Sequence, residues 1–109
     1  MATGRLGTAN ITSTADTTVY TVPASTFSVV SVNVVNRSSS ATASIRIAVA
    51  SSATPGAAEY IEYDSSLVAN GVLERTGIVM DASKLIVVST PTATPSLSVV
   101  VYGIETSTA

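Results

Sequence analysis

The densest group of ionisable side chains lies at residues 59–64, where the sequence EYIEYD holds three carboxylates and two tyrosines. Side chains of a strand alternate between its faces, so Glu62 and Asp64 are expected on one face with Tyr60, opposite Glu59. Neighbouring carboxylates can hold a hard cation such as Ca²⁺. No calcium-loop spacing accompanies them, so the favoured interpretation is solvated charge on an edge strand, where charge opposes pairing between sheets. A cation at Glu62 and Asp64 is the alternative.

Side chains that commonly act as nucleophile or base are scarce. The chain has no His and no Cys, so imidazole bases, imidazole metal ligands and thiol nucleophiles are missing. A serine with Lys84 as its base is compatible with the residue types, but nothing marks one serine among 17. We therefore expect a protein that is not an enzyme and that uses no cofactor.

Glu74 and Arg75 are adjacent opposite charges in the middle of an apolar segment. Each can pair across the sheet or across a boundary between subunits. Exposed ion pairs contribute only about 0.2–1 kcal/mol to stability. Pairing within the chain is the favoured interpretation, and pairing between subunits is the alternative.

The composition favours association between protein molecules. Of 109 residues only 11% are charged and 46% are hydrophobic, whereas average soluble domains carry about 25% charged residues. The net charge is −2 and the five cations are scattered along the chain, so nucleic-acid binding is not expected. No apolar run suits a signal peptide or a membrane span, so we expect a chain that starts at Met1 and has no membrane partner.

The segments that position these side chains have the composition of strands. Val, Ile, Thr and Tyr fill short apolar runs, and no 3.6-residue periodicity is sustained. The expected strands are residues 6–11, 17–22, 27–36, 44–50, 59–64, 72–80, 84–89 and 97–104. Seven or eight short strands predict an all-β fold with two antiparallel sheets packed as a sandwich, either jelly-roll or Ig-like. We expect one domain over residues 1–109, with short flexible ends near 1–5 and 106–109.

The longest expected strand carries valine on both faces. Val30, Val32 and Val34 point one way, whereas Val29 and Val35 point the other way with Ser and Asn between them. In residues 44–50 the same alternation places Ile45, Ile47 and Val49 inward and Arg46 outward.

Asn70 and Gly71 give the strongest turn signal in the chain. Asn-Gly suits the positive φ angles of a type I′ turn, and apolar residues flank it on both sides. The sequence therefore predicts a hairpin at this position.

A sandwich sheet has one inner face, so the valines of the second face must be covered by loops, be covered by another subunit, or remain as an exposed patch. Burial of about 1,000 Å² of apolar area contributes on the order of 25 kcal/mol, which exceeds the estimated 4–15 kcal/mol cost of association. We expect a closed homo-oligomer, a trimer or a dimer. The candidate interface residues are Val29, Val35, Glu74, Arg75, Val100 and Tyr102.

Four segments of the chain resemble small structural proteins of tailed bacteriophages, cyanophages among them. These are residues 17–24 (TTVYTVPA), 32–38 (VNVVNRS), 60–64 (YIEYD) and 73–78 (LERTGI). The resemblance implies a β-sandwich virion protein, made in the cytoplasm of the infected bacterium and incorporated in many copies. It implies a head decoration or cement protein that binds the outer capsid surface, with a major capsid or tail protein as partner.

Two alternatives to head decoration remain. The first is a tail, baseplate or fibre-adaptor component. The second is a carbohydrate-binding β-sandwich module, for which the aromatic side chains are the candidates. These are Tyr20, Phe27, Tyr60, Tyr63 and Tyr102.

Overall fold

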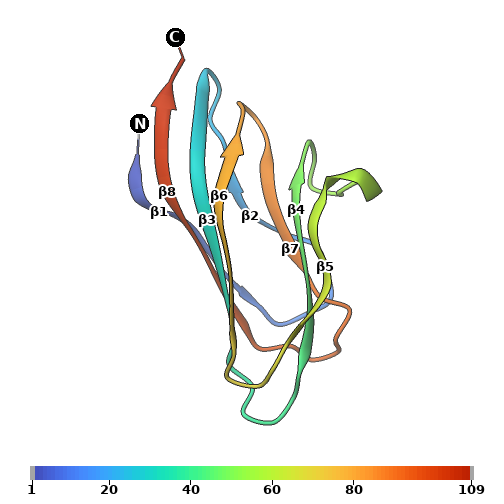
Figure 1. Cartoon of the computed structure of the whole chain (residues 1–109). Coiled ribbons are helices and arrows are strands. Elements are labelled where there is room, and N and C mark those ends of the chain that lie inside the picture. The colour runs from blue at the N-terminus through green and yellow to red at the C-terminus, as the bar shows by residue number, and fades with distance from the viewer. Residues whose placement is uncertain (1, 109) are drawn as a thin grey trace.

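Short strands rich in valine and isoleucine pair into two layers in the computed structural model, which describes residues 2–108 (Figure 1). Within these residues eight strands form two four-stranded antiparallel sheets packed as a sandwich, which confirms the predicted fold class. The elements are β1 (Thr3–Ile11), β2 (Thr17–Thr21), β3 (Thr26–Asn36), β4 (Ala43–Ala50), the 3₁₀ turn η1 (Ala57–Glu59), β5 (Tyr60–Leu67), β6 (Val72–Met80), β7 (Leu85–Ser89) and β8 (Leu97–Ser107). Within the described residues no helix is long and apolar enough to cross a membrane.

The strand order distinguishes the two expected topologies. Sheet A has the order β1-β8-β3-β6, and sheet B has the order β2-β7-β4-β5. Consecutive strands alternate between the sheets except for β4 and β5, which are neighbours in sheet B. Two sheets of four strands with this alternation form a jelly roll, whereas Ig-like domains divide their strands differently.

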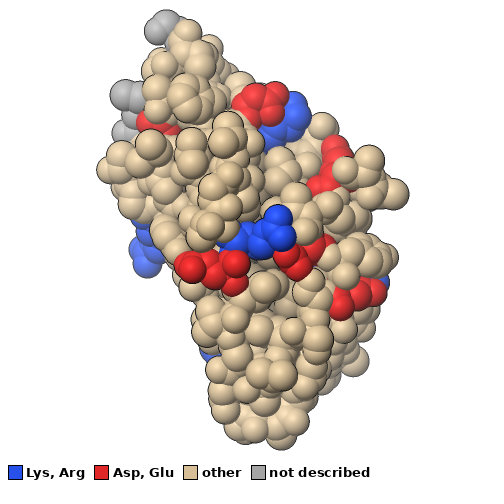
Figure 2. Space-filling model, viewed as in Figure 1, with Lys and Arg blue, Asp and Glu red and all other residues tan. Residues whose placement is uncertain are grey.

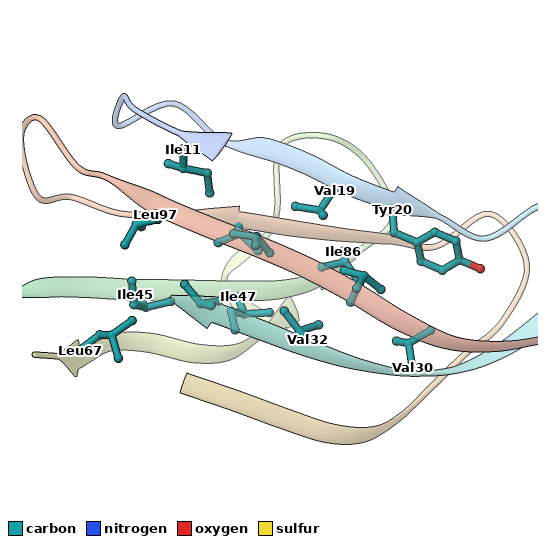
Figure 3. Packing of buried hydrophobic residues seen from close by; sticks show 14 of the residues in the cluster. Ile11, Val19, Tyr20, Val30, Val32, Ile45, Ile47, Leu67, Ile86 and Leu97 are labelled. Carbon is teal, nitrogen blue, oxygen red and sulfur yellow. The ribbon is translucent and has the colours of Figure 1, made fainter. Parts of the chain in front are cut away.

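The core lies between the sheets and follows the predicted alternation. Val30 and Val32 of β3 are buried in one cluster with Ile45 and Ile47 of β4 (Figure 3). Val34 belongs to the same cluster. Val49 is partly buried and packs against the same cluster, as expected for an inward position. Removal of these aliphatic side chains from water provides the main driving force for packing the two sheets together.

The outer face of sheet B is partly covered by the chain itself. Ala48, Ala50 and Val87 are buried there, with Tyr60 packed against them. The loop between β4 and η1 is held in place by the Glu59 carboxylate, which accepts hydrogen bonds from the backbone N–H groups of residues 56 (2.8 Å) and 51 (3.1 Å). These bonds hold the pKa of Glu59 below its usual value. Val87 is thus an outward valine that needs no other subunit to cover it.

The predicted hairpin at Asn70 and Gly71 is wrong. The strands on either side belong to different sheets, because β5 lies in sheet B and β6 in sheet A. The Gly71 N–H donates to the Val68 carbonyl (2.9 Å), so the turn lies one residue earlier than expected, and Asn70 has a φ of 58°. The Asn70 N–H donates to Ser38 O (3.0 Å), so the turn bonds to the β3–β4 connection rather than closing a two-stranded ladder.

Strand pairing in sheet A extends close to both ends of the described residues. Strand β1 begins at residue 3 and β8 continues to residue 107. The Glu105 N–H donates to the Ala2 carbonyl at 2.9 Å, so pairing between β1 and β8 extends to this end. Met1 and Ala109 lie outside the described residues.

Candidate functional site

The outer face of sheet A, called the A face below, consists of side chains that alternate away from the core. Residues directly opposite each other on paired strands share a face, so the register defines its members. They are Thr3, Arg5, Thr8 and Asn10 on β1; Ser98, Val100, Tyr102, Ile104 and Thr106 on β8; Phe27, Val29, Ser31, Asn33 and Val35 on β3; and Val72, Glu74 and Val79 on β6.

One end of the A face is apolar. Val79, Val29 and Ile104 lie in register across β6, β3 and β8. Phe27, two residues before Val29, lies on the same side of β3. Val79 is 71% exposed, Ile104 49% and Phe27 37%. These neighbouring side chains form a patch, called the apolar row below, and exposed apolar patches commonly mark interaction sites.

The middle of the A face is polar. The Tyr102 hydroxyl donates a short hydrogen bond to Glu74, which raises the pKa of Tyr102 together with partial burial. Arg5 lies opposite Tyr102 on the edge strand β1 and has no ion-pair partner within residues 2–108. The middle of the face therefore carries one cation and one anion on different strands, and a second cation, Arg37, donates a hydrogen bond to Asn10 near the far end of the face.

Five of the six candidate interface residues lie together on the A face: Val29, Val35, Glu74, Val100 and Tyr102. The three valines are half-buried by their neighbours in the sheet. Arg75 is the exception, because it lies opposite the buried Val32 and so turns toward the sandwich interior.

Arg75 forms an ion pair between the two sheets. Its guanidinium lies 2.5 Å from the carboxylate of Glu62, which belongs to β5 at the edge of sheet B. The Glu62 side chain is only 15% exposed. Arg75 thus pairs with a carboxylate within the chain, whereas Glu74 accepts a hydrogen bond from Tyr102 and has no ion-pair partner within residues 2–108. In Figure 2 charges of opposite sign lie side by side across the middle of the molecule, and the lower end is almost wholly uncharged.

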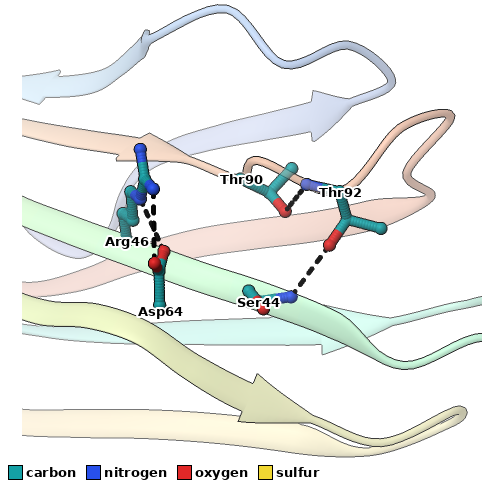
Figure 4. Close-up of polar contacts among 5 residues, drawn as sticks. All are labelled: Ser44, Arg46, Asp64, Thr90 and Thr92. Carbon is teal, nitrogen blue, oxygen red and sulfur yellow. Dashed lines mark hydrogen bonds and ion pairs between the residues drawn. The ribbon is translucent and has the colours of Figure 1, made fainter.

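The structure separates Glu62 from Asp64, which were expected on one face. Glu62 lies opposite the inward Ile47, whereas Asp64 bonds to the outward Arg46 at 2.6 and 3.3 Å (Figure 4). The register between β4 and β5 shifts at this point, and Asp64 has a φ of 55°. An extra residue in one strand moves the side chains that come after it to the opposite face of the sheet. Each carboxylate therefore faces an arginine instead of sharing a cation. No group of three acidic side chains suited to a metal occurs within residues 2–108.

A second candidate site lies on the outer face of sheet B, beside the ion pair of Arg46. The rings of Tyr60 and Tyr63 meet edge to face with centroids 5.0 Å apart. The Arg46 guanidinium lies 4.3 Å from the centre of the Tyr63 ring. Tyr60, Tyr63 and Ala57 line an open hollow of about 410 Å³. This arrangement offers apolar ring surface beside charged hydrogen-bonding groups.

Threonine hydroxyls bond the β7–β8 loop to β4 and within the loop. The Ser44 N–H donates to Thr92 Oγ1 at 3.0 Å, and the Thr92 N–H donates to Thr90 Oγ1 at 3.1 Å (Figure 4). These contacts fix the β7–β8 loop against β4. Their hydroxyls are thus engaged in holding the loop.

Lys84, the candidate base for a serine, is engaged elsewhere. Its ammonium group lies 3.3 Å from the Asp81 carboxylate, in the turn between β6 and β7. The lysine that the serine hypothesis needs as a base is thus paired with a carboxylate.

Comparisons with protein-family models, curated proteins and solved structures found no match for this chain. Function is therefore inferred from the chemistry of the two outer sheet faces. Sequence reasoning missed Arg5, Phe27, Val79 and Ile104 as members of the A face. The alternation of β3 and β8 can reveal Phe27 and Ile104, since they share parity with Val29 and Val100, whereas an irregularity in β6 hides Val79.

Proposed function

We propose that this protein is a non-enzymatic structural protein of a tailed-bacteriophage virion. It is made in the cytoplasm of the infected bacterium and is incorporated in many copies. The favoured location is the head, where an oligomer decorates or cements the outer surface of the capsid. Support comes from the resemblance of residues 17–24, 32–38, 60–64 and 73–78 to small virion proteins.

The observation that carries this proposal is the apolar row of the A face. Val79, Ile104 and Phe27 are exposed side by side in a chain that is only 11% charged. A solitary molecule gains nothing from exposing such a patch, whereas an assembly buries it and gains the free energy of apolar burial. A protein contact on the A face is the use that fits these side chains best.

The fold is compatible with this function by analogy. Jelly rolls occur in viral capsid proteins and also in lectins, so the fold alone does not choose between them. The chain has one small sandwich and no fibrous repeat, which favours shell decoration over a fibre. A tail, baseplate or fibre-adaptor component is the alternative location.

Co-sedimentation with purified heads and purified tails of a phage whose genome encodes the chain tests the proposal. We expect saturable binding to heads, reduced by Val79→Asp on the A face. Val68→Asp is the matched control, since Val68 is 62% exposed outside this face, and it is expected to bind like wild type. Binding to tails alone supports the alternative location, and binding to neither particle contradicts the proposal.

A glycan-binding module is a second candidate function, because of the hollow lined by Tyr60 and Tyr63. Pyranose rings stack their apolar C–H faces on aromatic rings, and charged groups such as Arg46 and Asp64 bind hydroxyls. Tyr63 is 58% exposed and thus reachable by a sugar. Glycan-array binding that is lost with Tyr63→Ala and kept with Tyr102→Ala supports this function, and absence of binding by the wild-type chain counts against it.

A further inference from the structure

The A face is large enough for a stable contact with one other protein molecule. Its strands contain nine to eleven residues. At about 3.3 Å per residue and about 4.8 Å between strands, four of them give a plane of roughly 30 by 19 Å. Side chains corrugate this plane, so its accessible area approaches the roughly 800 Å² that each partner contributes to a standard interface.

The two charges of the A face lie on opposite edges. Arg5 is on β1 and Glu74 is on β6, the two edge strands of sheet A. Three strand spacings separate them, about 14 Å, so they do not pair within one molecule. Through the register of Tyr102 and Asn33, their positions differ by only two residues along the strands, about 7 Å.

This charge layout is self-complementary under one symmetry operation. A twofold axis that lies between two stacked A faces and runs parallel to the strands places β1 of one copy over β6 of the other. Every level of the face then meets its own level, so Val29 and Ile104 of one copy pack on Ile104 and Val29 of the other, and Val79 lies over Thr3. Arg5 of each copy lies two residues, about 7 Å, along the strand from Glu74 of the other, and an extended arginine side chain spans this distance.

A twofold axis in the same plane that runs across the strands gives a poorer match between the charges of the two copies. It stacks each edge strand on its own counterpart, so Glu74 lies near Glu74 and Arg5 lies near Arg5. Like charges placed face to face oppose association. The charges therefore select the axis parallel to the strands.

We infer that the A face binds a second copy of this chain, forming a twofold-symmetric dimer in which the sheets stack face to face. The inference deepens the proposed structural function, because it names the occupant of the A face and selects a dimer over a trimer. The contact is isologous, so it closes on itself and leaves the outer face of sheet B free to dock on a larger shell.

Sedimentation equilibrium of the full chain tests this dimer. Wild type is expected to dimerise, Arg5→Glu and Glu74→Arg each to weaken dimerisation about tenfold or more, and the double variant to restore it. Val79→Asp in the apolar row is expected to give monomers, whereas the control Val68→Asp dimerises like wild type. Circular dichroism checks that each variant remains folded.

Three results would overturn the inference: a wild-type chain that stays monomeric at high concentration, a double charge reversal that fails to restore dimers, or equal loss with Val68→Asp. Co-sedimentation with phage particles distinguishes a wrong dimer from a wrong virion function. A monomer that binds phage heads overturns only the dimer, whereas a dimer that binds no particle overturns only the virion function.

Discussion

The Tyr20 hydroxyl of β2 donates a 2.6 Å hydrogen bond to the Glu105 carboxylate of β8, and so joins sheet B to sheet A. Tyr20 is buried, and its ring belongs to the core cluster. At the other open edge of the sandwich, Arg75 and Glu62 join the sheets in the same way. The two sheets are thus connected by polar contacts at both edges as well as by their aliphatic core.

Stability is expected to fall as the pH rises from about 10 to about 12. Burial and then the hydrogen bond to Glu105 raise the pKa of Tyr20 to about 12 from 10.0. The folded state holds the Tyr20 proton more tightly than the unfolded state, so this stabilisation is complete below pH 10 and is lost through pH 12. Urea unfolding across this range measures the fall, which Tyr20→Phe should reduce. An equally steep fall in Tyr20→Phe would contradict the assignment.

The ion pair of Arg75 and Glu62 is expected to show a coupling free energy of about 0.5–1 kcal/mol in a double-mutant cycle with Arg75→Met and Glu62→Gln. Arg75 is partly solvated, which limits the free energy that the ion pair contributes, whereas Glu62 is mostly buried. Salt should weaken the coupling. Additive effects of the two substitutions would show that the contact between the sheets contributes no stability at this edge.

Asn36 is expected to be intolerant of charge. Its side-chain N–H groups donate to the carbonyls of Ala41 (2.9 Å) and Leu67 (3.1 Å), and the residue is only 1% exposed. Asn36→Asp removes these donors and places an anion against two carbonyls, so we expect a loss of about 2–4 kcal/mol in chemical unfolding. The same substitution at the half-exposed Asn33 is the control; it places a carboxylate opposite Glu74 and should cost less than about 1 kcal/mol. Equal effects at both positions would contradict the role of Asn36.

Gly103 is expected to reject any larger side chain. A Cβ at this position would lie 2.1 Å from the Val29 carbonyl oxygen and 2.8 Å from Val30 Cα, which are backbone atoms of the neighbouring strand β3. Gly103→Ala should therefore reduce the free energy of unfolding by about 2–3 kcal/mol. Gly56→Ala, whose Cβ would meet only Glu59 at 3.7 Å, is the control and should be nearly neutral. A tolerated Gly103→Ala would show that β8 and β3 do not approach so closely.

The sequence predicts the strands and the core of this fold well, because alternation of Val and Ile directly encodes one buried face. Val30, Val32 and Val34 are buried as expected. The Asn70–Gly71 signal misleads, since it reports a turn but not which sheet the following strand joins. That choice depends on distant contacts, such as the bond between the Asn70 N–H and Ser38.

The composition of the outer faces is harder to predict, because a single extra residue reverses the face of all later side chains. Between Val30 and Val32 the register with β6 shifts, and Gly77 there has a φ of 70°. Ile78 consequently packs against the core and Val79 points outward. A corresponding shift in β5 separates Glu62 from Asp64. Neither shift has a marker in the hydrophobic pattern.

Hydroxyl-radical footprinting of the chain, free at low concentration and within purified phage particles, tests the central claim that the A face is a contact surface in an assembly. We predict that Phe27, Val79 and Ile104 are labelled in the free chain and protected in the particle. Val68, exposed in the connection between β5 and β6, serves as the internal reference. Equal labelling of the A face in both states, or absence of the chain from the particles, would contradict the claim.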